Sequence, residues 1–239
     1  MAIISFLTTA LALAATAVQA APSSSSTLET RATEIFFEDQ FTTLDQTRWW
    51  CEYGNCPRMV NDMAKFELAA NTRNANSSII LNNQQFTWGI FRFSLSLSPQ
   101  PAARVFWGAS LYNNGPNEDG SLYSQIDFGF YTDNTRFSNS QLFLESAVNG
   151  QRKTIDITAN SINLYDGNPK TFQLEFNATR LSLSINDVYV AGHNEAAFLP
   201  SLPLTFSMGP RVLSDSTSLL TETWSQNVDY LLVNGGAPA

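Results

Sequence analysis

Charged residues are scarce in this chain. Asp, Glu, Lys and Arg together make up 14% of its 239 residues, against about a quarter in an average soluble protein. Only 13 residues are Lys or Arg, and the formal net charge is −8. Binding to nucleic acid or to an anionic membrane surface depends on clustered basic side chains, so we expect neither partner. A neutral ligand such as a glycan is compatible with this charge balance.

Cysteine and histidine are almost absent, with two Cys and one His in the whole chain. A structural zinc site needs four ligands of this kind, so the sequence excludes one. Cys51 and Cys56 are separated by four residues, whereas thioredoxin-like redox motifs have two. In an oxidising compartment the pair predicts a local disulfide. His193 lies in a turn-like stretch without a Ser or Cys motif near it, and we interpret it as a surface loop residue rather than a general base.

Long hydrophobic runs are confined to the N-terminus. Residues 3–18 are apolar apart from Ser5 and three Thr, and the run ends in Val18-Gln19-Ala20. Small residues at these positions are typical of a cleavage site, so we predict a secretory signal peptide over residues 1–20. A membrane anchor is the alternative, but the run is short for a span and lacks a basic flank. We therefore expect an extracellular protein, with a cell wall as one setting, and no membrane partner.

A helical hydrophobic period is also missing, and short alternating segments take its place. Residues 21–33 are rich in Ser and Thr, and we interpret them as a disordered leader. Beyond them, the pattern predicts an all-β fold, an antiparallel β-sandwich or jelly roll. We expect one domain over residues 34–235 and a short tail over 236–239, with hairpin turns at Asn149-Gly150 and Asp166-Gly167. The expected strands are residues 78–81, 89–97, 104–111, 124–131, 142–148, 154–158, 171–176, 180–185, 188–190, 204–208 and 228–233.

The segment from 124 to 131 has the chemistry of a binding strand. Its apolar residues alternate with Gln125, Asp127, Gly129 and Tyr131, which places these four on one open face. An acid beside an amide and an aromatic ring on a rigid strand is common in sugar-binding clefts. An ordinary half-buried strand with one solvated Asp is the alternative.

Two glycosylation sequons support the secretory interpretation. Asn76 begins Asn-Ser-Ser and Asn177 begins Asn-Ala-Thr. Each predicts an exposed loop on a secreted glycoprotein.

Five short segments occur in a recognisable order. They are FFEDQF with LDQTRW (36–49), FTWGIF (86–91), VFWG (105–108), the paired segments between 172 and 190, and NVDYLLV (227–233). Together they resemble glycoside hydrolase family 16, within the concanavalin A-like lectin/glucanase superfamily. The resemblance covers about residues 35 to 234. It implies the sandwich fold of that superfamily and a polysaccharide partner of the β-glucan type.

The resemblance also implies that the catalytic motif is degenerate. Segment 124–131 lies where the family has Glu-x-Asp-x-Glu, whose two Glu residues act as nucleophile and as acid/base. Here Asp127 is retained, Gln125 stands at the nucleophile position, and Gly129 stands at the acid/base position, or Phe130 if the strand has a bulge. An amide does not attack as a carboxylate does, and neither Gly nor Phe transfers a proton. Standard hydrolase activity is therefore not expected.

The first hypothesis is a secreted glycan-binding protein that has kept the cleft of the family. Trp88, Trp107, Gln125, Asp127 and Tyr131 would line it, since aromatic faces stack on sugars and polar groups bind hydroxyls. For the two Trp residues, core packing is an equally good interpretation. We expect a monomer that requires no cofactor. Trp49 and Trp50 are assigned to core and turn packing.

Two other hypotheses remain open. An active glycosidase or transglycosylase on β-glucans would need a relocated acid pair, for which Glu118, Asp119 and Glu145 are the candidates. A structural or interaction protein would show no glycan retention. Asp229 aligns with a residue that some family members use for a structural calcium, although a lone carboxylate provides few of the six to eight oxygen ligands.

Overall fold

The computed structural model describes residues 33–113, 124–131, 142–157, 162–214 and 216–238. These residues belong to one compact unit that spans residues 31–239. The expected signal peptide and nearly all of the expected leader lie outside the described residues. No helix among the described residues is long and apolar enough to cross a membrane.

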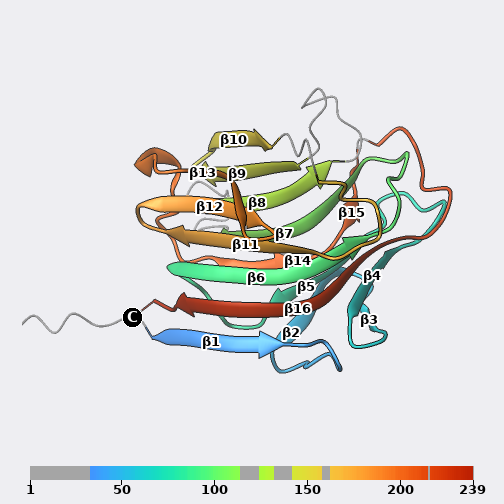
Figure 1. The fold of residues 1–239 in the computed structure, drawn as a ribbon, viewed down its shortest axis with the longest axis horizontal. Helices are drawn as coiled ribbons and strands as arrows, with labels where there is room; N and C mark the ends of the chain where they lie inside the picture. The colour runs from blue at the N-terminus through green and yellow to red at the C-terminus, as the bar shows by residue number, and fades with distance from the viewer. Residues whose placement is uncertain (1–32, 114–123, 132–141, 158–161, 215, 239) are drawn as a thin grey trace, which may run out of the picture. The chain divides into compact units, whose positions relative to one another are not determined.

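Eight strands form the first of two antiparallel sheets (Figure 1). Its order is β13-β12-β11-β6-β16-β4-β3, and β1 pairs with the C-terminal part of β16. The strands are β1 (Glu34–Asp39), β3 (Arg58–Met59), β4 (Ala64–Leu68), β6 (Trp88–Leu97), β11 (Lys170–Asn177), β12 (Arg180–Ile185), β13 (Val188–His193) and β16 (Trp224–Gly236).

The second sheet also has eight strands and carries the candidate site. Its order is β10-β9-β8-β7-β14-β5-β2, and β15 pairs with β7 beyond the end of β14. The strands are β2 (Trp49–Gly54), β5 (Ser77–Leu81), β7 (Val105–Asn113), β8 (Ser124–Tyr131), β9 (Leu142–Val148), β10 (Gln151–Ile157), β14 (Thr205–Met208) and β15 (Arg211–Val212). A single 3-10 turn, Ala196–Phe198, is the helical element of the described chain.

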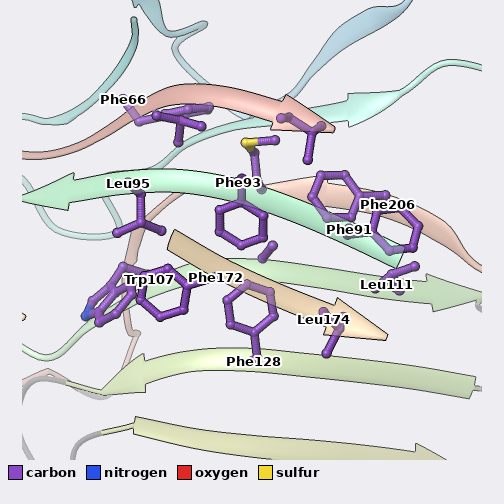
Figure 2. Close-up of a cluster of buried hydrophobic side chains, with 14 of the residues drawn as sticks. Phe66, Phe91, Phe93, Leu95, Trp107, Leu111, Phe128, Phe172, Leu174 and Phe206 are labelled. Carbon is purple, nitrogen blue, oxygen red and sulfur yellow. The ribbon is translucent and has the colours of Figure 1, made fainter. Parts of the chain in front are cut away.

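Aromatic side chains from both sheets meet in the core (Figure 2). The Phe93 ring of the first sheet lies 5.1 Å from that of Phe128 in the second, and the Phe91 ring lies 4.9 Å from that of Phe206. Each of these residues alternates along its strand with outward-facing neighbours, as packing of two sheets face to face requires. The predicted all-β sandwich is therefore confirmed.

Local turn chemistry explains where the sequence interpretation held and where it failed. The Asn149-Gly150 hairpin is confirmed between β9 and β10, with φ values of 50° and 81° that this tight turn requires. The prediction of a hairpin at Asp166-Gly167 is wrong. This dipeptide lies in the connection from β10 to β11, and these two strands do not pair: β10 pairs with β9, and β11 with β12 and β6. A hairpin at Asn186-Asp187, with φ values of 50° and 64°, joins β12 to β13 without a Gly.

The two adjacent tryptophans of β2 have different environments. Trp49 is buried in the core beside Phe41 and Phe206. Trp50 points to the other side of the strand and is 56% exposed. The assignment of both to packing is thus corrected for Trp50, because neighbouring strand residues face opposite sides.

Candidate functional site

Strand β8 is regular along its whole length. Its register with β7 and with β9 runs without a shift, so no bulge displaces its side chains. Ile126 and Phe128 are in the core, and the alternation places Gln125, Asp127 and Gly129 on the opposite face. Gly129, rather than Phe130, therefore shares the face of Asp127. Tyr131 pairs with β7, but its side chain lies outside the described residues.

A row of polar residues crosses this face of the second sheet. Glu145 of β9, Asp127 of β8, Ser110 of β7 and Ser207 of β14 are successive cross-strand partners. All four are buried. Buried polar side chains need hydrogen-bond partners. Four of them in succession across one sheet face are unusual, and their partners show what this part of the fold can do.

Asp127 is the least satisfied member of the row. It is 6% exposed, and its Oδ2 accepts a hydrogen bond from Gln125 Nε2. Its Oδ1 has no hydrogen-bond partner among the described residues. Burial raises the pKa of the Asp127 carboxyl, against the opposing effect of hydrogen bonds from Ser110 and Gln125. A buried carboxyl with a displaced pKa is a frequent sign of a functional site.

Glu145 supplies a second carboxylate directly beside Asp127. Residues opposite each other in an antiparallel pair have Cβ atoms about 4.5–5.5 Å apart, so the two carboxyls are neighbours. Arg152 Nη1 lies 2.6 Å from one oxygen of Glu145, and Thr154 Oγ1 donates a 2.6 Å hydrogen bond to the other. Both oxygens are thus held by β10, and both acids are buried, which leaves little carboxylate surface for a substrate.

A hollow of about 390 Å³ opens on the same face, next to Gln125; we call it the central hollow. Its walls come from β2, β5, β7, β8, β14 and β15 and from the connections beside them. The lining residues are Glu52, Tyr53, Asn76, Ser78, Phe106, Ala109, Ser110, Tyr112, Gln125, Ser207, Met208, Gly209, Pro210 and Arg211. Eight of the fourteen lining residues carry a hydroxyl, amide or carboxylate group, set among apolar side chains, a mixture that suits a ligand with both C–H faces and hydroxyls.

Glu52 is the carboxylate of this hollow, and the sequence interpretation missed it. Tyr112 and Ser207 both donate hydrogen bonds to its side chain, and Ser78 Oγ lies 3.4 Å from Oε2. Burial, together with the hydrogen bond to Glu52, raises the pKa of the Tyr112 hydroxyl. The hydrogen-bond partners of Glu52 are 26 to 155 residues away, so no local pattern reveals them. The one feature of the sequence that could have drawn attention to Glu52 is its position directly after Cys51.

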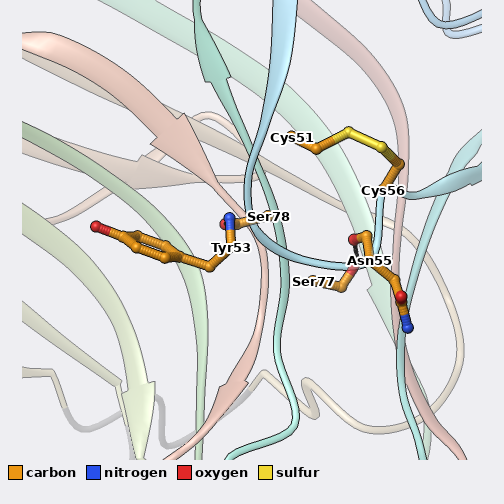
Figure 3. Close-up of a disulfide and its surroundings, with 6 residues drawn as sticks. All are labelled: Cys51, Tyr53, Asn55, Cys56, Ser77 and Ser78. Carbon is orange, nitrogen blue, oxygen red and sulfur yellow. Dashed lines mark hydrogen bonds between the residues drawn. A yellow bond between two sulfur atoms is a disulfide. The ribbon is translucent and has the colours of Figure 1, made fainter.

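The predicted disulfide between Cys51 and Cys56 is confirmed (Figure 3). It closes the loop that carries Tyr53, a lining residue of the central hollow. Ser77 Oγ donates a 2.8 Å hydrogen bond to the carbonyl of Asn55, and the backbone N–H of Tyr53 donates one of 3.1 Å to Ser78 Oγ. These bonds tie the disulfide loop to β5. Tyr53 projects from the loop away from the disulfide and is 57% exposed. Its ring forms an aromatic rim on the central hollow.

The face above Gly129 is occupied by neighbouring groups. A Cβ added at Gly129 would lie 2.2 Å from the Trp107 carbonyl oxygen and 2.8 Å from the Phe106 ring. The guanidinium of Arg211 covers the same Phe106 ring at 4.6 Å from its centroid. A larger side chain at position 129 would therefore have to displace backbone, so a carboxylate cannot be restored there by a simple Gly129→Glu substitution.

Neither tryptophan predicted for the cleft lies in it. Trp107 is fully buried and packs edge-on against Phe172 and Tyr165 in the core. Trp88 belongs to β6 of the first sheet, where it alternates with the core residue Phe91 and so points away from the second sheet. Both assignments are corrected, because short sequence motifs do not reveal which face of which sheet a strand presents.

The sequon residues differ in their surroundings. Asn177 lies exposed at the end of β11 in the turn to β12, as expected, and its side chain accepts a hydrogen bond from the Thr179 backbone. Asn76 is half-buried at the edge of the central hollow, and its Nδ2 donates to the Asn74 carbonyl. The expectation of an exposed loop is therefore wrong for Asn76.

Of the acids considered for catalysis or calcium, Glu118 and Asp119 lie outside the described residues. Asp229 is exposed at a bulge of β16. The described parts of the chain contain no group of three or more His, Cys, Asp or Glu residues that could hold a metal ion.

His193 lies at the end of β13 and connects the two sheets instead of occupying a surface loop. Its Nε2 is 2.8 Å from Ser146 Oγ of β9, and its Nδ1 accepts a hydrogen bond from the Glu195 backbone N–H. With Nδ1 as acceptor, the neutral ring carries its proton on Nε2 and donates to Ser146. The pair therefore has the wrong tautomer for a nucleophilic serine, and Ser146 is fully buried.

Comparisons with solved structures identify the fold. A β-glucanase from Bacillus licheniformis matches with a TM-score of 0.64 at 12% identity, over 83% of this chain and 97% of that one. The catalytic domain of an endo-1,3-β-glucanase (laminarinase) from Thermotoga petrophila matches with 0.65 at 10%, over 85% and 99%. A glycoside hydrolase family 16 endo-glucanase from Bacteroides ovatus matches with 0.63 at 14%, over 82% and 99%. No protein-family model and no curated protein sequence matches the chain. The described sandwich is thus the jelly-roll fold of family 16 glucanases.

Proposed function

We propose that this protein binds a neutral polysaccharide of the β-glucan type in the central hollow. The observation that carries the proposal is the composition of that hollow: the exposed ring of Tyr53 stands beside Glu52, Gln125 and Tyr112 on one face of a glucanase-like sheet. Solved structures of the same fold bear the names β-glucanase and laminarinase, which supports this ligand class.

The chemistry of the hollow suits a pyranose chain. An aromatic ring at the rim offers an apolar face for the C–H groups of a sugar. In the same hollow, Glu52 Oε1 takes one hydrogen bond, from Tyr112, and so keeps capacity for a second donor. Gln125 offers its amide oxygen and the N–H that does not bond Asp127. A volume of about 390 Å³ falls in the range of small-ligand sites.

We further propose that the bound glycan is not hydrolysed by the two-carboxylate mechanism. Gln125 lacks the nucleophilic carboxylate, and Phe106 fills the space over Gly129. Glu145 lies beside Asp127, but its oxygens are engaged by Arg152 and Thr154. A retaining reaction needs two accessible carboxyl groups about 5–5.5 Å apart, and no such pair faces the central hollow among the described residues.

Secretion is part of this proposal. The N-terminal signal pattern and the Cys51–Cys56 disulfide support it, since disulfides persist in oxidising compartments. The exposed sequon at Asn177 is the more accessible glycosylation site of the two. We propose a monomer at a cell wall or in the extracellular medium.

The test is retention of the secreted protein on insoluble β-1,3-glucan, with reducing sugar measured in the same samples. Tyr53→Ala should abolish most retention. Tyr189→Ala is the matched control, because this tyrosine is equally exposed at 57% but lies on β13 of the first sheet. Absence of retention in the wild type would refute glycan binding. Sugar release that disappears in Glu52→Gln would show a hydrolase instead.

A further inference from the structure

A second hollow of about 550 Å³ lies at the β2 edge of the second sheet; we call it the edge hollow. Among the described residues, every side chain that lines it is uncharged, and four consecutive amides form one wall. The lining residues are Ile35, Trp50, Ile80, Leu81, Asn82, Asn83, Gln84, Gln85, Thr205, Ala237 and Pro238. Because the described residues give it no charged side chain to desolvate and several amides that can hydrogen-bond, this surface suits a neutral, hydroxyl-rich molecule.

Trp50 is the dominant side chain of this region. It is 56% exposed, although tryptophan is among the most buried residues on average. It also borders another depression, of about 370 Å³, lined by Leu44, Gln46, Trp49 and Cys51. The indole therefore stands between two hollows with much of its surface open, which is the arrangement of a stacking platform.

Two of the amides have spare hydrogen-bonding capacity. Asn82 Oδ1 and Gln84 Oε1 are buried atoms without a hydrogen-bond partner in the described structure. The terminal amide torsion is soft, so a small rotation would present either oxygen to a donor. A sugar hydroxyl bound beside Trp50 would supply that donor.

The edge hollow and the central hollow share one face of the sheet. Trp50, Ile80 and Ser207 are successive cross-strand partners, and Ser207 lines the central hollow. Two strand spacings separate Trp50 from Ser207, about 10 Å. Thr205 and Ser207, two residues apart on β14, line one hollow each. No strand intervenes to separate the two sites along β14.

We infer that Trp50 forms a second glycan subsite, so that one polysaccharide chain runs from the central hollow across β14 and β5 to the β2 edge. The inference rests on the proposed function and adds to it: the ligand is recognised as a polymer, through two separated aromatic contacts, Tyr53 and Trp50. A short oligosaccharide reaches only the central hollow, whereas a longer one reaches both.

Calorimetric titration with linear β-1,3-linked gluco-oligosaccharides tests this directly. The wild type should bind the hexasaccharide more tightly than the disaccharide. Trp50→Ala should weaken hexasaccharide binding about tenfold and leave disaccharide binding unchanged, because a stacked ring contributes about that factor. Trp50→Phe should restore most of the difference, whereas Tyr53→Ala should weaken both ligands. Tyr189→Ala should change neither.

The outcomes separate the two proposals. Equal hexasaccharide affinity in wild type and Trp50→Ala would refute the subsite while leaving the central site intact, and so would equal loss for both ligand lengths. Wild-type protein that binds neither ligand would refute the glycan-binding function itself. Because Trp50 is mostly exposed, Trp50→Ala should leave the thermal midpoint unchanged. That result would exclude misfolding as the cause of weaker hexasaccharide binding.

Discussion

Replacing Asp127 by asparagine tests whether this buried acid is retained at the expense of stability. Its Oδ1 has no partner in the described structure, and Glu145 lies opposite on the neighbouring strand. A buried polar atom without a partner costs about 1–3 kcal/mol. In Asp127→Asn, the amide can direct its donor toward Glu145 and keep its oxygen toward Gln125 Nε2.

We expect Asp127→Asn to raise the free energy of unfolding at pH 7 by about 1–3 kcal/mol. For a domain of this size, each kcal/mol corresponds to about 2–4 °C in thermal midpoint. The gain should depend on pH. Because burial raises the pKa of Asp127 in the folded state, the folded protein binds this proton more tightly than the unfolded chain. The stability that protonation provides is present below the ordinary value of 3.8 and is lost as pH rises through the raised pKa.

The assay is thermal or urea unfolding of both proteins from pH 4 to pH 8. The difference between variant and wild type should be small at the acid end and grow with pH. Asp156→Asn is the matched control, because Asp156 is exposed on β10 of the same sheet and loses the same formal charge. A destabilised variant, or a difference that does not change with pH, would refute the reasoning that burial of the Asp127 charge is unfavourable.

Three further predictions concern the surroundings of the site. Gly129→Ala should destabilise the fold by about 1–3 kcal/mol in urea unfolding, because its Cβ would meet the Trp107 carbonyl oxygen at 2.2 Å. An unchanged urea midpoint would contradict this and show that the β8 backbone shifts at little energetic cost. Replacing Cys51 and Cys56 by Ala should cost about 2 kcal/mol, as expected for so short a loop, and should also weaken glucan retention because the loop carries the aromatic rim; retention at wild-type strength would contradict that positioning role. His193 should contribute stability at neutral pH that is lost as pH falls below 6.5, since burial and the nearby lysine of β10 lower its pKa in the folded state. In His193→Gln, the thermal unfolding midpoint should therefore change less between pH 7 and pH 5 than in the wild type. The same pH dependence in both proteins would refute this.

Local patterns in the sequence are enough to predict the class of fold and its main strands. Alternation such as that of Phe91, Phe93 and Leu95 already separates a core face from an outer face. The alternation of β8 likewise placed Gln125 and Asp127 together. The disulfide followed from the spacing of two cysteines. These features are local, because neighbouring residues on one strand determine them.

Which strands meet at the site depends on the folded structure. Trp88 and Trp107 look like cleft aromatics in the sequence, yet one belongs to the other sheet and the other faces the core. Glu52 and Tyr53 enter the central hollow because β2 pairs with β5 at the far end of a sheet that β8 also joins. Strand order across a sheet depends on pairings distant in sequence, which no local pattern encodes. For the same reason, the exposure of Trp50 became visible only once its strand was placed at the edge.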